Sequence, residues 1–160
     1  MTDPSDPSPK AAPFRVLCVC LGNICRSPIA EGVFVARAEA AGHRLTVDSA
    51  GTSDWHLGDP PDPRAIAAAA ARGIDIARQR ARQVRPEDFL DFDLILAMDN
   101  RNLAKLEGLR PASATARLRL AHPDGIEVPD PYSGGAEGFE TVLDMLDAVA
   151  ESVLAAANDR

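Results

Sequence analysis

Short apolar segments alternate with segments of helical periodicity along the chain. The apolar segments have the length of buried strands and lie at residues 14–20, 45–48, 94–98 and 116–120. Helices are predicted at residues 27–41, 64–72 and 100–107, with a helical turn starting at residue 86 and a last helix from about residue 137. Ser27 is expected to cap the first helix, with Pro28 in its first turn, and Gly42 to end it. The last helix repeats apolar side chains every three or four residues, which predicts a buried face: Phe139, Val142, Leu143, Leu146, Val149 and Val153.

This alternation predicts an α/β fold, a three-layer sandwich around a central four-stranded parallel sheet. Strands separated by helices pair in parallel through right-handed crossovers. Ligands of such sheets bind at the carboxyl ends of the strands. The segment from Cys20 to Ser27, directly after the first strand, is therefore the expected site.

Composition and charge indicate one ordinary globular domain. Of the 160 residues, 46% are hydrophobic and 26% are charged, which is sufficient for a full core. Residues 1–13 are rich in Pro, Asp and Ser and are predicted to be a disordered leader, followed by a single domain at residues 14–160. The net charge of −7 argues against a nucleic-acid partner. The chain contains no apolar stretch of about 18 residues, so no membrane span is expected. A monomer or weak dimer is expected.

Three cysteines, Cys18, Cys20 and Cys25, lie close together near the first strand. An odd number at this spacing fits neither a disulfide framework nor a structural zinc site. Free thiols are typical of a reducing compartment, and with no signal peptide evident a cytoplasmic location is expected. Cys18, inside the strand, is expected to pack as a small hydrophobe. Cys25 is either a packed thiol or a reversible oxidation partner of Cys20.

A phosphate-binding loop is predicted between the first strand and the first helix, in the sequence CLGNICRSP at residues 20–28. Backbone amides without helical partners meet the positive end of a helix dipole there. Gly22 and Asn23 permit an unusual backbone conformation, and the Arg26 guanidinium matches two phosphate oxygens. The same surroundings favour the thiolate of Cys20, which is the predicted nucleophile.

A leaving group such as a tyrosyl oxygen has a pKa near 10, so its departure at neutral pH requires a proton donor. Asp130 is the candidate, because Pro131 stiffens its loop and Tyr132 is suited to wall a substrate slot. An ordinary solvated aspartate in a turn is the alternative.

Neither a metal site nor a cofactor is predicted. Asp91 and Asp93 precede an apolar strand, whereas the paired carboxylates of metal-dependent phosphatases follow one, so they are interpreted as a solvated turn. The histidines do not have the spacing of a metal motif: His43, His56 and His122.

With these residues the chain resembles the low-molecular-weight protein tyrosine phosphatases. Similar segments occur in the same order over roughly residues 14–157: VLCVCLGNICRSPIAEGVF, DSAGTSDWHLGDPPDPRA, FDLILAMDNRNL, VPDPY and FETV. The resemblance implies a single phosphatase domain that hydrolyses phosphotyrosine, in proteins or as a small aryl phosphate, without a metal. It also implies a cysteinyl-phosphate intermediate.

The resemblance implies a role for each matching residue. Cys20 is the nucleophile, Arg26 holds the phosphoryl oxygens, and Asp130 protonates the leaving group and then activates water. Asn23, Ser27 and Ser49 would shape the loop and assist Cys20. Trp55 and Tyr132 would flank the substrate ring. The full set of expected substrate-binding residues is Leu21, Gly22, Asn23, Ile24, Cys25, Ser27, Ser49, Trp55 and Tyr132.

Two positions depart from the family pattern. Ser133 stands where many members have a second aromatic residue, so a more open ring slot is expected. Gln79 lies in a segment where many members have a histidine, so an altered polar network behind Asn23 is expected.

Three other functions are compatible with such a loop. A thioredoxin-coupled arsenate reductase needs two further cysteines downstream, and none follows Cys25. A protein-arginine phosphatase tends to carry threonine where Ile24 stands. A non-catalytic phosphate-binding module does not need the complete set of Cys20, Arg26 and Asp130.

Overall fold

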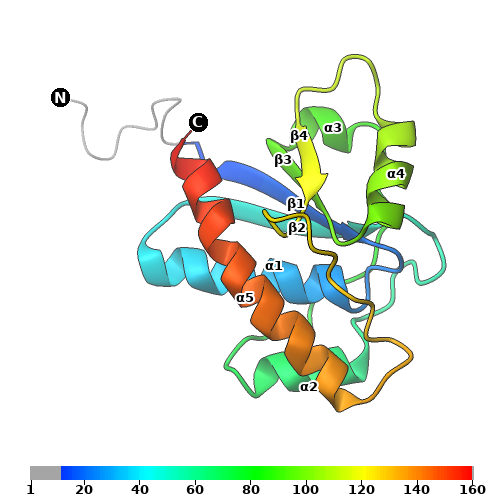
Figure 1. Ribbon diagram of the computed structural model, residues 1–160, viewed down its shortest axis with the longest axis vertical. Helices are drawn as coiled ribbons and strands as arrows, with labels where there is room; N and C mark the ends of the chain where they lie inside the picture. Colours follow the sequence, from blue (N-terminus) through cyan, green and yellow to red (C-terminus); the bar gives the residue numbers. More distant parts are fainter. Residues whose placement is uncertain (1–11, 160) are drawn as a thin grey trace.

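Strands and helices alternate in the order that the sequence predicts (Figure 1). The structure is a computed structural model and describes residues 12–159. The predicted leader at residues 1–13 lies outside the described residues, except for its last two. The elements are β1 (Phe14–Cys20), α1 (Arg26–Ala41), β2 (Leu45–Gly51), α2 (Pro63–Ala70), α3 (Asp88–Asp91), β3 (Leu94–Ala97), α4 (Asn100–Leu109), β4 (Arg117–Leu120) and α5 (Ala136–Asn158).

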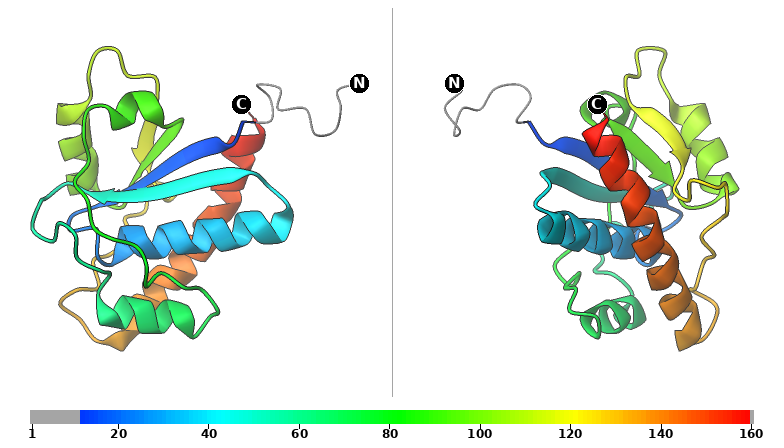
Figure 2. Two further views of the ribbon diagram at one scale, coloured as in Figure 1. Left: turned by 180° about the vertical axis from the view of Figure 1, so that it is seen from behind. Right: turned by 60° about the vertical axis from the view of Figure 1, so that its left-hand side comes forward.

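A four-stranded parallel sheet in the order β2-β1-β3-β4 forms the centre of the molecule. Helices α1, α2 and α5 lie on one side of it, and α3 and α4 lie on the other (Figures 1 and 2). The three layers confirm the predicted α/β sandwich. Among residues 12–159, no helix has the length and apolar character needed to cross a membrane.

β1 contributes to a hydrophobic core on each face of the sheet. Val16 and Cys18 pack in the core beneath α1 and α5, whereas Leu17 and Val19 pack in the core beneath α3 and α4. All four side chains are fully buried, which explains why this strand is a continuous apolar run. Cys18 packs as the small hydrophobe that the sequence predicts.

The predicted start of α1 is wrong by about two residues. The helix begins at Arg26 with Cys25 as its N-cap, and Cys25 makes no side-chain capping bond. Ser27 lies inside the first turn, where its hydroxyl is bonded to the loop that precedes the helix instead of to a helical amide. Gly42 ends the helix in the left-handed conformation, with φ of 72°, as predicted.

Strand β2 is longer than predicted and reaches Gly51, which pairs with Cys20 at the end of β1. A side chain at Gly51 would collide with the loop after β1, because its Cβ would lie 2.8 Å from the carbonyl oxygen of Leu21. The end of β2 therefore supports this loop by close backbone approach.

Candidate active site

In the loop between β1 and α1, backbone carbonyl groups accept hydrogen bonds from the segment that follows β2. Backbone amides within residues 52–62 donate to the carbonyl oxygens of Cys20, Leu21 and Ile24 at 2.9, 3.0 and 2.8 Å. Among residues 12–159, no backbone carbonyl accepts a hydrogen bond from the amides of residues 21–25. These amides precede the N-terminus of α1 and are available to bind an anion.

Asn23 holds the loop in shape from behind. Its φ of 57° is left-handed, and among residues 12–159 no other non-glycine residue has a positive φ. The side-chain amide donates to the hydroxyls of Ser27 at 2.8 Å and Ser49 at 2.9 Å, and its oxygen accepts from the backbone N–H of Arg82 at 3.0 Å. Three hydrogen bonds thus stabilise a conformation that is costly for most side chains.

Gln79 completes this network from the segment in which family members often have a histidine. Its Oε1 lies 3.4 Å from the Ser49 hydroxyl, and its Nε2 donates to the carbonyl oxygen of Pro28 at 3.0 Å. The network behind Asn23 is therefore closed by a neutral amide, with no imidazole at this position.

Cys20 lies at the base of the loop, 2% exposed. Its Sγ is 3.1 Å from the hydroxyl oxygen of Ser27. Because that oxygen accepts a hydrogen bond from the Asn23 amide, its own proton is available to the sulfur; the other acceptor in reach, the carbonyl of Ala50, is at 3.4 Å. A hydroxyl proton directed at the sulfur stabilises the thiolate.

Arg26 is held between two carboxylates. Its Nη1 donates to Asp99 at 2.7 Å and to the carbonyl oxygen of Val128 at 3.1 Å, and its Nη2 lies 3.7 Å from Asp130. Burial lowers the pKa of Arg26, but the charge of Cys20, the hydrogen bond and charge of Asp99, and the charge of Asp130 outweigh this effect and raise it. The guanidinium therefore stays charged beside the loop, in a fixed orientation.

The other two cysteines are neutral thiols at physiological pH. Burial, followed by the charges of Asp62 and Cys20, raises the pKa of Cys25 to about 12. Complete burial raises the pKa of Cys18 well above its usual value. All three cysteines are unpaired in this structure, and a bridge between Cys20 and Cys25 under oxidation stays a prediction.

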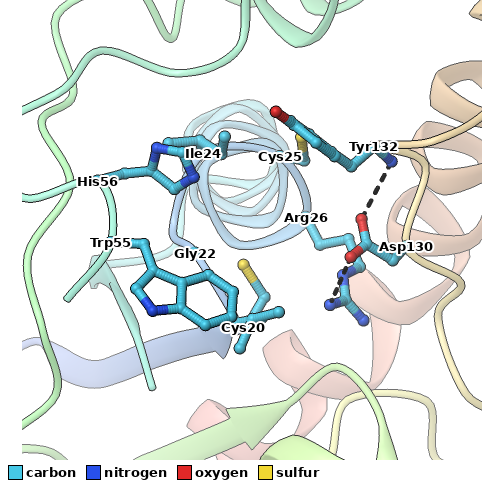
Figure 3. Close-up of a pocket in the computed structure, with 10 residues that line it drawn as sticks. Cys20, Gly22, Ile24, Cys25, Arg26, Trp55, His56, Asp130 and Tyr132 are labelled. Atoms are coloured by element: carbon cyan, nitrogen blue, oxygen red, sulfur yellow. Dashed lines mark hydrogen bonds and ion pairs between the residues drawn. The ribbon is translucent and has the colours of Figure 1, made fainter. Parts of the chain in front are cut away.

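A pocket of about 220 Å³ opens over the loop (Figure 3). Trp55 and His56 stand on one side of Cys20, and Tyr132, Asp130 and Arg26 stand on the other. Trp55 is 69% exposed and Tyr132 is 52% exposed, so these two residues form walls at the mouth of the pocket. The lining residues are Cys20, Leu21, Gly22, Ile24, Cys25, Arg26, Trp55, His56, Asp130 and Tyr132.

Asp130 reaches this pocket from the loop before α5. One carboxylate oxygen accepts the backbone N–H of Tyr132 at 3.1 Å, and the other lies near Arg26. The carboxylate lines the pocket opposite Trp55. It is also a half-exposed aspartate in a turn, so its role as the catalytic acid stays a prediction.

The predicted substrate-binding residues fall into two groups. Six line the pocket, namely Leu21, Gly22, Ile24, Cys25, Trp55 and Tyr132. Asn23, Ser27 and Ser49 lie behind the loop instead and hold it through hydrogen bonds.

The sequence analysis does not predict two residues of the site, His56 and Asp99. His56 lines the pocket, and a Cβ on Gly22 would lie 3.0 Å from its ring, so Gly22 leaves room for the imidazole. Asp99 binds Arg26 with one oxygen and caps α4 with the other. Its position just after β3 is a usable signal, because ligands bind beyond the carboxyl ends of parallel strands. Among residues 12–159, no group of three or more His, Cys, Asp or Glu side chains is arranged to hold a metal ion.

Glu31 of α1 lies near Ser49, Asp48 and Arg82, beside the network behind the loop. Burial raises the pKa of Glu31 to about 7, and the negative charge of Asp48 adds to this, against the lowering effects of Ser49 and Arg82. The folded state therefore binds the Glu31 proton more tightly than the unfolded chain, where the pKa is near 4.5.

We expect Glu31→Gln to stabilise the protein at pH 8 more than at pH 5. As the pH rises from about 4.5 to about 7, the unfolded state ionises Glu31 first, so the wild-type protein loses stability and the variant does not. Allowing for partial solvent exposure, the difference between the two pH values should be roughly 1–2 kcal/mol. Urea unfolding at both pH values measures it. Glu39→Gln, on the exposed side of the same helix, is the control, and an equal effect of both variants would contradict the assignment.

Comparisons with known proteins agree on one family. The family model described as low molecular weight phosphotyrosine protein phosphatase matches residues 15–160. A low molecular weight protein-tyrosine-phosphatase of Streptomyces coelicolor is 42% identical over 157 residues, covering 92% of this chain and 95% of the relative.

Solved structures show the same fold. A protein tyrosine phosphatase from Entamoeba histolytica, with Hepes in its active site, has a TM-score of 0.85 and 36% identity. The match covers 91% of this chain and 97% of that chain. A Drosophila arginine phosphatase has a TM-score of 0.82 and 32% identity, and the match covers 88% of this chain and 96% of that chain.

Proposed function

This chain belongs to the low molecular weight phosphotyrosine protein phosphatases, and from that premise we propose how its residues carry out the reaction. It is a phosphatase that dephosphorylates phosphotyrosine. The assignment of individual residues rests above all on one observation. Cys20, Arg26 and Asp130 line a single pocket, although Asp130 lies more than a hundred residues from the other two in the chain.

In the first step, the Cys20 thiolate attacks phosphorus and the bond from phosphorus to the tyrosyl oxygen breaks. Asp130 gives its proton to that oxygen, so tyrosine leaves as a neutral phenol. The product is a phosphoryl group on the sulfur of Cys20. The neighbouring Ser27 hydroxyl, 3.1 Å from the sulfur, supports the assignment because it stabilises the thiolate before attack.

In the second step, water attacks the phosphorus of this intermediate. The Asp130 carboxylate takes a proton from the water, the sulfur–phosphorus bond breaks, and inorganic phosphate and the Cys20 thiolate are released. Both steps therefore use the same carboxyl group in opposite protonation states. The exposure of Asp130 at the mouth of the pocket supports this role, because water must reach it.

Charge on the transferred phosphoryl group is stabilised by the loop. The amides of residues 21–25 and the Arg26 guanidinium provide donors that are oriented before substrate arrives. Asp99 fixes Arg26 through a 2.7 Å bond, so little reorganisation is needed during the reaction. The relative from Entamoeba histolytica holds Hepes, a sulfonate, in its active site, which supports binding of tetrahedral oxyanions by this chain.

The substrate side chain is an aromatic ring in this proposal. Trp55 and Tyr132 stand on opposite sides of the opening, where aromatic side chains can contact a substrate ring. Ile24 presents an apolar surface in the same pocket, which disfavours the polar guanidino group of phosphoarginine. Ser133 leaves the mouth of the pocket without a further aromatic wall, which suits phosphotyrosine within a protein.

We expect kcat/KM for a phosphotyrosine peptide to exceed that for a phosphoarginine peptide by about 10-fold or more, since one polar–apolar mismatch in a pocket has this magnitude. Activity should persist in excess EDTA. Ile24→Thr should reduce the preference for the phosphotyrosine peptide over the phosphoarginine peptide, because the threonine hydroxyl can bind the guanidino group. Preferential hydrolysis of phosphoarginine by the wild-type enzyme would reject the proposed substrate, and complete inhibition by EDTA would reject the proposed chemistry.

We further propose that residues 14–160 act as one phosphatase domain, as a monomer or weak dimer in the cytoplasm. Three unpaired cysteines, one of them the nucleophile, support a reducing compartment, where the thiolate stays available.

A further inference from the structure

Arg64, on the first turn of α2, is bonded to the loop that carries the catalytic acid. Its Nη2 donates to the carbonyl oxygen of Tyr132 at 2.8 Å and its Nη1 to that of Gly134 at 3.1 Å. Both acceptors belong to the segment we term the acid loop, residues 130–135. Arg64 is not among the residues that line the pocket, so it acts on this loop from outside the site.

The same guanidinium is connected to the phosphate-binding loop. Its Nε and Nη2 bind the two carboxylate oxygens of Asp62 at 3.1 and 2.9 Å. The backbone amide of Asp62 donates in turn to the carbonyl oxygen of Ile24 at 2.8 Å. A continuous path of hydrogen bonds therefore runs from the phosphate-binding loop through Asp62 and Arg64 to the acid loop.

Ring contacts fix the position of the guanidinium. It lies 4.8 Å from the ring centre of Phe139, which is buried at the start of α5, and 5.6 Å from that of Tyr132. Asp62 is 9% exposed and caps α2 by accepting the backbone N–H of Arg64. A side chain held by a bidentate carboxylate and two rings is a rigid support.

The acid loop has few other attachments. Within the part of the chain that the structure describes, the other hydrogen bonds of residues 131–135 are local. Tyr132 bonds to Asp130 and Gly134 to Pro131 within the acid loop, and Gly135 accepts from Gly138 of α5. Asp130 contacts Arg26 at 3.7 Å, which is longer than a hydrogen bond. Except for Pro131, the loop is exposed. Pro131 packs near Gly138 of α5, and Val128, two residues before Asp130, is bonded to Met98 and Arg26. Between these anchors, the two bonds from Arg64 tie the loop to α2.

We propose that Arg64 is a positioning residue, which holds the catalytic acid at a fixed distance from the phosphate-binding loop. This inference rests on the proposed role of Asp130 as the acid. Misplacement of a catalytic group by about 1 Å can lower a rate up to 100-fold. Removing Arg64 should therefore weaken proton transfer to the leaving group while the nucleophile and the phosphate-binding loop stay intact.

The test is the ratio of kcat/KM values for phosphotyrosine and for nitrophenyl phosphate. Both substrates place an aromatic ring in the same slot, but nitrophenol leaves readily without a proton, so the ratio isolates the acid. We expect Arg64→Gln to lower the ratio by about 10-fold, and Arg64→Lys to lower it less because lysine can replace one of the bonds. Asp62→Asn, which still caps α2, should shift it in the same direction.

Arg72→Gln is the matched control. Arg72 lies just beyond the other end of α2 and joins it to α5 through Glu140 and Asp144, without touching the acid loop. We expect its ratio to equal that of the wild type. An unchanged ratio in Arg64→Gln, or an equal fall in Arg72→Gln, overturns the proposal. If Asp130→Ala itself leaves the ratio unchanged, the acid assignment fails and Arg64 fails with it; if only Asp130→Ala shifts the ratio, the role of Arg64 alone is refuted.

Discussion

Replacing Cys20 with serine is expected to lower kcat/KM for aryl phosphates by about 10⁴-fold or more, the loss typical of removing an essential nucleophile. The two side chains have nearly the same shape, so the pocket should remain intact. A neutral hydroxyl is a far weaker nucleophile than a thiolate, and the amides of the loop and Arg26 cannot compensate. Substrate binding should persist, because these anion-binding groups are unchanged.

Rapid-quench mass spectrometry of the wild-type enzyme tests the same assignment directly. A phosphoryl adduct should be found on the peptide that contains Cys20 and be absent from Cys20→Ser. Cys18→Ala is the control, since it removes a buried thiol two residues away that faces the core and not the pocket. Its turnover should remain near that of the wild type, with lower stability. An adduct on another residue, or substantial turnover by Cys20→Ser, would contradict the mechanism.

The second large effect is expected for Asp130→Ala, and its size should depend on the leaving group. For phosphotyrosine, kcat/KM should fall by about 10²–10⁴-fold, the usual contribution of a general acid. For nitrophenyl phosphate the fall should be smaller by more than about 10-fold, because nitrophenolate is a better leaving group and depends much less on a proton. The measured quantity is kcat/KM, which reports only the steps up to formation of the intermediate.

Asp124→Ala provides the comparison for Asp130→Ala. Asp124 is an exposed aspartate on the same connection between β4 and α5, outside the pocket, and its loss should affect neither substrate. If Asp130→Ala loses activity equally on both substrates, Asp130 does not protonate the leaving group. Its proximity to Arg26 would then be electrostatic only.

Charge at this site is arranged so that the nucleophile and the anion-binding groups differ in sign. Arg26 stays cationic between Asp99 and Asp130, while Cys18 and Cys25 remain neutral. Glu31 lies near the supporting network, and its contribution to stability changes below about pH 7.

Most of the phosphate-binding loop is determined by local sequence. Nine consecutive residues contain the end of a strand, a left-handed Asn23, the nucleophile, the arginine and the start of a helix. Short-range backbone preferences and the unpaired amides at a helix N-terminus follow from neighbouring residues alone. For this reason the sequence predicts the strand and the loop correctly, and it errs on the cap of α1 because Ser27 bonds to Cys20 and Asn23 instead of to the helix.

The residues around the loop are decided by the order of strands in the sheet. Asp99 and Val128 reach Arg26 across 73 and 102 positions of the chain, and Arg64 reaches the acid loop across 68 and 70. No local pattern encodes such pairings, because they arise when β3 aligns beside β1 and when α2 packs against α5. The amino-acid sequence alone therefore specifies an anion site with an adjacent thiol, whereas only the packed structure specifies what holds the arginine and what positions the acid.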